Sequence, residues 1–149
     1  MNNLEILQKT LLFKGCSRDE LELILGMIRE RQIRRDTVIF SEKMPSVALC
    51  IVKNGAVRIT TSAGGEEAGL LLLGPGDFFG ELALVHEEVK LVSARAETTV
   101  DLLLLTRKDF EYLLDLAPRA ASRLLLAISR LLAMRLHANG ERLKELLLS

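Results

Sequence analysis

The sequence is poor in the residues that bind metals and form disulfides. It has two cysteines, Cys16 and Cys50, and two histidines, His86 and His137, among 149 residues. Neither cysteine lies in a C-x-x-C pair or at metal-ligand spacing from a histidine, so we expect two buried free thiols and no metal site. No motif typical of a catalytic triad, a Walker loop or a zinc hydrolase is present. These absences predict that the protein is not an enzyme and needs no cofactor.

The chain also lacks an excess of charge and any long apolar run. Twenty basic residues balance twenty acidic ones, so no overall field attracts nucleic acid or an acidic membrane. Apolar runs such as the leucines at 70–73 and 102–105 are too short to cross a bilayer. Met1 is not followed by the basic segment of a secretion signal. We therefore expect a cytoplasmic protein with no nucleic-acid partner and no membrane partner.

Size and hydrophobic content indicate one domain that spans residues 1–149. Hydrophobic residues make up 49% of the chain, which is enough for a single core at this length. Residues 1–31 have helical patterns, and Ser17 and Glu20 form an S-x-x-E capping box at the start of the second helix. We expect that helix to end near Arg31.

The central segment, 32–106, has the pattern of an antiparallel sandwich or barrel. Its runs of Val, Ile, Leu and Thr are separated by turn residues at intervals of roughly ten residues, which is typical of such folds. Asn54-Gly55 lies between two of these runs. Because both residues tolerate positive φ, the pair predicts a β-hairpin.

Residues 107–149 are expected to be helical again. Pro118 is well placed as the first residue of a long helix that reaches Leu147. A coiled-coil spacing runs along this helix: Leu125, Leu132, Asn139 and Leu146 recur every seven residues, with Ser129, Leu136 and Leu143 between them. The spacing predicts a dimer seam with Asn139 as its polar member, although Gly140 costs the helix about 1 kcal/mol relative to Ala.

The stretch GPGDFFGELAL at 74–84 places three glycines and the carboxylate of Glu81 among hydrophobic strands. Glycine allows backbone amides to come close to another group, so this turn is suited to an anion. Phe78 and Phe79 by themselves favour a structural role as core aromatics over a ligand contact. Glu81 needs a partner if it is buried, which makes it the more informative residue.

With these residues in place, the chain resembles the cyclic nucleotide-binding domain family, which includes the catabolite activator protein. The most specific match is GDFFGELAL, which fits the family's phosphate-binding cassette of the form G-[DE]-x-F-G-E-[LI]-[AS]-L. FSEKMPSVALCIVKNGAVRI and RLLAMRLHANGERLKEL are supporting matches, the latter to the family's dimer helix. The resemblance implies an α+β fold, in which an antiparallel, jelly-roll-like β-roll is flanked by N-terminal helices and a long C-terminal helix. It places the cassette at 74–95.

The resemblance also implies ligand-binding roles within the cassette, with cyclic AMP or cyclic GMP as the ligand. The amides of Gly80 and Leu82 would hold the cyclic phosphate at the start of a short helix, where the partial positive charge favours an anion. Glu81 would accept a hydrogen bond from the ribose 2′-hydroxyl. Phe79 would pack beneath the cassette, and Ala83 belongs to the same ligand-binding stretch.

The sequence departs from the family after the cassette helix. Lys90 aligns with the family's phosphate-binding arginine, and Leu91 aligns with a small or hydroxylated residue. Lysine supplies charge but not the planar fork that grips two phosphate oxygens, so we expect weaker phosphate binding. Lys90 is equally explained as a solvated charge beside Glu87 and Glu88.

The terminal helix carries two more open assignments. Asn139 aligns with the family's base-contacting region and can pair with a purine edge, or it sets the register of the dimer seam. The helix also carries six cations, Arg119, Arg123, Arg130, Arg135, Arg142 and Lys144. We interpret them as a solvated cationic face, because no helix-turn-helix segment follows before Ser149.

Two functions of different classes follow. The first is a stand-alone, non-enzymatic cyclic nucleotide sensor that forms a homodimer through its last helix and signals to an unidentified output protein. The alternative is a degenerate member that no longer binds nucleotide and serves as a dimerisation or docking module. A cupin-type enzyme is the least favoured, since it needs several histidines close together on its strands, and only His86 lies in that region.

Overall fold

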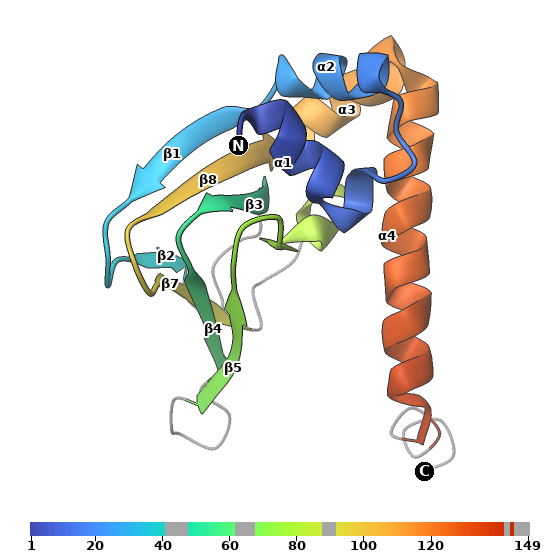
Figure 1. Cartoon of the computed structure of the whole chain (residues 1–149). Coiled ribbons are helices and arrows are strands. Elements are labelled where there is room, and N and C mark those ends of the chain that lie inside the picture. The colour runs from blue at the N-terminus through green and yellow to red at the C-terminus, as the bar shows by residue number, and fades with distance from the viewer. Residues whose placement is uncertain (41–47, 62–67, 88–91, 142–143, 145–149) are drawn as a thin grey trace.

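The computed structural model describes residues 1–40, 48–61, 68–87, 92–141 and 144 (Figure 1). Three helical segments come first: α1 Asn3–Lys9, the 3-10 helix η1 Leu11–Phe13 and α2 Arg18–Leu25. The predicted capping box is confirmed, because the Ser17 side chain accepts from the Glu20 amide and the Glu20 carboxylate accepts from the Ser17 amide. The predicted end of α2 near Arg31 is wrong. Gly26 caps the helix, and the first strand already begins at Arg29.

Within the described residues, eight strands form two antiparallel sheets, which confirms the β-roll and the α+β class. The strands are β1 Arg29–Ile33, β2 Val38–Phe40, β3 Ala48–Asn54, β4 Val57–Thr61, β5 Ala68–Leu73, β6 Phe78–Phe79, β7 Ser93–Ala96 and β8 Val100–Thr106. The order in the first sheet is β1-β8-β3-β6, and in the second it is β2-β7-β4-β5. Strands distant in sequence are therefore neighbours, as in a jelly roll.

The turn at Asn54-Gly55 is present, but the hairpin predicted there is wrong. Gly55 has a φ of 85°, and a Cβ added to it would lie 2.3 Å from the carbonyl oxygen of Thr99. The strands on either side do not pair with each other: β3 pairs with β8 and β6, whereas β4 pairs with β5 and β7. The turn is the corner at which the chain leaves one sheet for the other.

The first sheet separates two hydrophobic cores. Successive residues of β3 and β8 point to opposite faces of the sheet. Leu49, Ile51, Leu103 and Leu105 pack with the helices in a helix-side core. Cys50, Val52, Val100 and Leu102 pack between the sheets in an inter-sheet core. Burial on both faces explains why these strands are continuously apolar in sequence.

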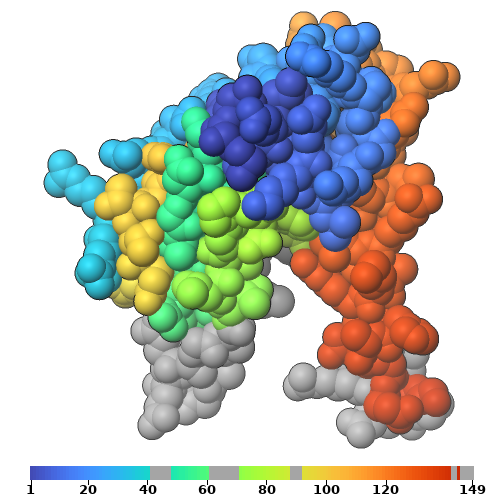
Figure 2. Space-filling view, viewed as in Figure 1, coloured from blue at the N-terminus to red at the C-terminus, as the bar shows by residue number. Residues whose placement is uncertain are grey.

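Two helices complete the chain, α3 Arg107–Leu116 and α4 Pro118–Ala138. Pro118 is the first residue of α4, as predicted. The helix starts beside α3 and runs along one side of the β-roll until its far end projects from the body of the molecule (Figures 1 and 2). Ala120, Ala121, Leu124 and Ile128 are buried in the helix-side core. Residues 133–138 are all exposed.

The helix predicted to run unbroken to Leu147 is interrupted, because α4 ends at Ala138; Gly140, Glu141 and Lys144 are helical again, and 142–143 and 145–149 lie outside the described residues. Asn139 caps α4: its backbone amide and its side-chain Nδ2 both donate to the Arg135 carbonyl, at 3.1 Å and 2.8 Å. Two residues of the expected seam, Leu125 and Leu132, are half-buried against the helix-side core. The seam positions Leu143 and Leu146 lie outside the described residues.

Candidate functional site

The cassette lies where the two cores meet. Phe79, at the end of β6, is buried in the inter-sheet core, and its ring centroid is 5.7 Å from that of Phe40. Leu84, at the end of the 3-10 helix η3 Glu81–Leu84, is buried in the helix-side core. The chain between them is thus held at both ends. Gly80 and Glu81 occupy the junction.

A left-handed residue exposes the amides at the start of η3. Gly80 has a φ of 77° and caps the helix, a conformation that favours glycine. The turn hydrogen bonds of this segment use the amides of Ala83, Val85 and His86. The amides of Gly80, Glu81 and Leu82 have no partner among the described residues. Successive unpaired amides at a helix start are suited to an anion.

Glu81 is buried, and an arginine from α4 neutralises it. The residue is 5% exposed, and its Oε1 accepts a hydrogen bond from Nη1 of Arg135 at 2.5 Å. A buried carboxylate is costly unless it is paired, and a charge-assisted bond of this kind is among the stronger ones. The hydrogen bond that Glu81 accepts within the described residues is the one from Arg135, and it uses Oε1.

Sequence reasoning missed Arg135 as a site residue. We interpreted it as part of a solvated cationic face, and the structure corrects this for two members of that face. Arg135 is paired with Glu81, while Arg123 donates to the Gly15 carbonyl at 2.6 Å and lies 3.4 Å from the Glu20 carboxylate. The only sequence signal for Arg135 was indirect, since a buried Glu81 requires a cation.

The remaining cassette residues are buried to different degrees. Ala83 is fully buried, and its carbonyl oxygen lies 3.5 Å from Nη1 of Arg107, a second arginine that sequence reasoning missed. Leu82 is half-buried and packs against the helix-side core. Phe79, Gly80, Glu81, Leu82 and Ala83 are therefore brought together at one place, and their ligand contacts stay predictions.

Three other predicted site residues have different outcomes. Lys90 and Leu91 lie outside the described residues. Asn139 is exposed one turn after Arg135, and its side chain is bonded to the Arg135 carbonyl. A contact between Asn139 and a base, or across a dimer seam, stays a prediction.

The described residues contain no group of three or more His, Cys, Asp or Glu side chains placed to hold a metal ion. Among the described residues neither cysteine forms a disulfide; Cys50 is buried and Cys16 is half-buried. Over the same residues, no helix combines the length and the apolar character needed to span a membrane.

Comparison with known proteins gives consistent matches. The family model for the cyclic nucleotide-binding domain matches residues 30–116. The chain is 36% identical over 120 residues to a cyclic AMP receptor protein of Thermus thermophilus, covering 80% of this chain and 56% of that protein. It is 31% identical over 121 residues to a cyclic nucleotide-gated potassium channel of Mesorhizobium japonicum, covering 81% of this chain and 32% of the channel. The chain thus spans about half or less of these relatives.

Solved structures agree in fold. The catabolite activator protein of Thermus thermophilus superposes with a TM-score of 0.80 at 34% identity, covering 92% of this chain and 63% of that one. The N-terminal domain of a transcriptional regulator from Streptomyces coelicolor A3(2) superposes with a TM-score of 0.81 at 27% identity, covering 87% of this chain and 94% of that one.

Proposed function

Because the chain belongs to the cyclic nucleotide-binding domain family, we propose that it is a regulatory sensor that binds cyclic AMP or cyclic GMP at the cassette. One observation carries the proposal: the amides of Gly80, Glu81 and Leu82, which have no partner among the described residues, lie next to the buried Glu81 carboxylate, where Arg135 bonds to Oε1. A cyclic nucleotide presents an anionic phosphate next to a ribose hydroxyl. The site offers donors for the first and an acceptor for the second.

In this proposal each group has one task. The three amides hold the cyclic phosphate, and Oε2 of Glu81 accepts from the ribose 2′-hydroxyl. Phe79 supports the cassette from the inter-sheet core. From the sequence alone, we propose that Lys90 supplies a counter-charge without the bidentate grip of arginine, while Leu91 stands where the family favours a small or hydroxylated residue.

Arg135 acts as a positioning residue. Its bond to Oε1 holds the buried Glu81 carboxylate in one orientation. The same bond joins residues 133–138 of α4, which are otherwise exposed, to the cassette. Nucleotide binding at Glu81 and docking of this part of α4 are therefore coupled, and each favours the other by the same free energy. We propose that this coupling shifts the population of α4 between a docked and an undocked arrangement.

The partners of this sensor are also proposals. We propose that it forms a homodimer through α4 and that an output protein senses the change in this helix. The family is regulatory rather than catalytic, and we propose no enzymatic activity, no nucleic-acid partner and a cytoplasmic location. A stand-alone role stays a prediction, because the chain spans only 56% of the Thermus receptor protein.

Isothermal titration calorimetry with cyclic AMP and cyclic GMP tests the proposal. We expect binding by the chain as it is and affinity lowered by about tenfold or more in Glu81→Gln, because a hydrogen bond to a charged group is lost. Glu111→Gln is the matched control, since Glu111 is an exposed carboxylate on α3. Absence of heat and of thermal stabilisation at millimolar nucleotide would contradict the sensor and favour the docking module.

A further inference from the structure

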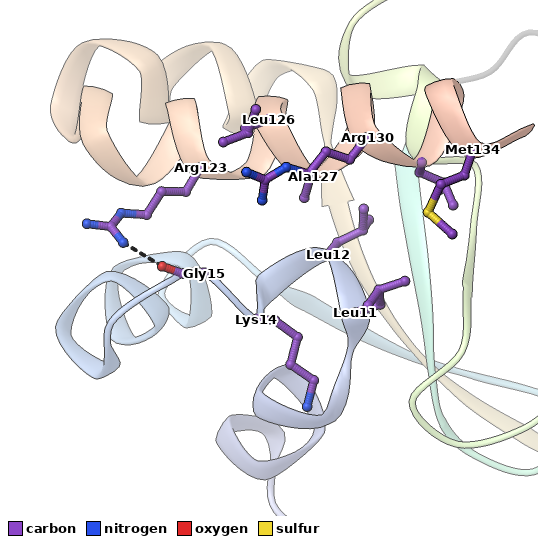
Figure 3. Close-up of a pocket in the computed structure, with 10 residues that line it drawn as sticks. Leu11, Leu12, Lys14, Gly15, Arg123, Leu126, Ala127, Arg130 and Met134 are labelled. Atoms are coloured by element: carbon purple, nitrogen blue, oxygen red, sulfur yellow. Dashed lines mark hydrogen bonds between the residues drawn. The ribbon is translucent and has the colours of Figure 1, made fainter. Parts of the chain in front are cut away.

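A hollow lies between η1 and α4 (Figure 3). Its volume is about 400 Å³, and none of the residues that line it belongs to β6 or η3. Leu11 and Leu12 form one wall, and Leu126, Ala127 and Met134 contribute to the other. The hollow is within the size range of small-molecule sites, about 300–1,000 Å³.

The walls of this hollow hold apolar surface that the chain itself leaves in water. Leu11 is 60% exposed, Leu126 49% and Met134 66%. An apolar ligand group that covered these side chains would gain from their removal from water. Met134 adds a flexible, polarizable side chain that adapts to the shape of its partner. The interior of the hollow therefore favours a hydrocarbon chain.

The rim of the hollow is positive and carries no acid. Its charged residues are Lys14, Arg123 and Arg130. Arg123 is already bonded to Gly15 and Glu20. Within the described residues the ion pairs of α4 are those of Arg123 and Arg135, which leaves Arg130 without an acidic partner. Figure 3 shows the Arg130 guanidinium between α4 and η1, while the Lys14 side chain points away from α4.

We propose that this hollow binds an anionic amphiphile, a long-chain carboxylate, with its head group on Arg130 and its hydrocarbon chain between η1 and α4. The guanidinium offers a planar pair of donors that matches a carboxylate. Charge complementarity selects the head group, and the apolar walls select the chain.

Titration calorimetry with dodecanoate below its micelle concentration tests the proposal, with dodecanol and dodecyltrimethylammonium as neutral and cationic amphiphiles. We expect one dodecanoate per chain and at least about tenfold weaker binding of the other two, because only the carboxylate gains a charge-assisted bond. Equal affinity for dodecanol, or no binding of dodecanoate, would overturn the proposal. So would binding of an acidic amphipathic peptide in place of dodecanoate.

Two substitutions separate the head-group site from the hydrocarbon site. Arg130→Gln is expected to weaken dodecanoate binding by about tenfold and to leave dodecanol binding unchanged. Met134→Ser is expected to weaken both. Arg119→Gln is the matched control, because Arg119 is an exposed arginine of α4 that does not line the hollow. Equal dodecanoate affinity in Arg130→Gln and Arg119→Gln would show that Arg130 does not hold the carboxylate.

Discussion

The two ends of α4 are held in different ways. Residues 118–132 pack against the helix-side core and bury Leu124 and Ile128 almost completely. Residues 133–138 are exposed, and their long-range hydrogen bond within the described residues is the one from Arg135 to Glu81. Packing fixes the first part, whereas one ion pair holds the second. The weakly held part of a structure is the part that a ligand can move, and here it is attached to the proposed ligand site itself.

The largest expected effect is a loss of packing in the proximal part of α4. Leu124→Ala removes a fully buried side chain and should lower the free energy of unfolding by about 2–5 kcal/mol, measured by urea denaturation. Leu136→Ala, at a residue 56% exposed in the distal part, is the matched control. It should change stability by less than about 0.5 kcal/mol. Similar losses of stability in both variants would contradict the view that packing fixes the proximal part of α4 but not the distal part.

Removal of Arg135 is expected to have the next largest effect. Arg135→Gln leaves the Glu81 carboxylate buried without its cation and should cost about 1–3 kcal/mol. A double-mutant cycle with Glu81→Gln should give a coupling energy of at least about 0.5 kcal/mol. Arg130→Gln is the control, since Arg130 has no acidic partner among the described residues. A coupling energy of zero would mean that the ion pair does not hold the distal part of α4.

Acid should weaken the ion pair between Arg123 and Glu20 in the proximal part of α4. The hydrophobic packing of that part should stay intact. Hydrogen bonds with the backbone amide and the hydroxyl of Ser17, together with the charge of Arg123, hold the pKa of the Glu20 carboxyl below its ordinary value of 4.5. The bond with the Ser17 amide has the largest effect. A lowered pKa in the folded state means that Glu20 stabilises the fold above pH 4.5. This contribution is lost as the pH falls through the folded-state pKa. Glu20→Gln should remove that part of the acid dependence, by about 1 kcal/mol or less. If the free energy of unfolding of Glu20→Gln falls with acid in the same way as that of the parent, Glu20 does not contribute to the acid dependence of stability.

The smallest effect on the folded chain is expected at the exposed residues of the distal part. Leu136→Ser should leave the free energy of unfolding within about 0.5 kcal/mol of the parent. If α4 pairs with a second copy, as proposed, the same substitution should raise the dimer dissociation constant, measured by light scattering over a dilution series. A dimer that dissociates at the same concentration in both proteins would place the dimer contact elsewhere.

The sequence predicted the local features of this chain better than the distant ones. The cassette and the α2 capping box were found because each is a contiguous motif whose residues act on their own neighbours. The prediction that β3 and β4 form a hairpin was wrong, because a turn residue specifies a bend but not which strands pair. β3 pairs instead with β8, which is far away in sequence. Arg135 was missed for the same reason. It meets Glu81 across 54 residues, and helical periodicity alone does not distinguish a solvated arginine from one that reaches a buried acid.

Nuclear magnetic resonance of the 15N-labelled chain, titrated with cyclic AMP and cyclic GMP, tests most directly whether the cassette and the distal part of α4 form one coupled unit. We predict that nucleotide shifts the amide signals of Gly80, Glu81 and Leu82 together with those of residues 133–138. In Arg135→Gln the cassette signals should still shift at higher nucleotide concentration, while those of 133–138 should not. Unchanged signals of Gly80, Glu81 and Leu82 at saturating nucleotide would contradict the proposed site. Equal shifts of 133–138 in both proteins would contradict the role of Arg135.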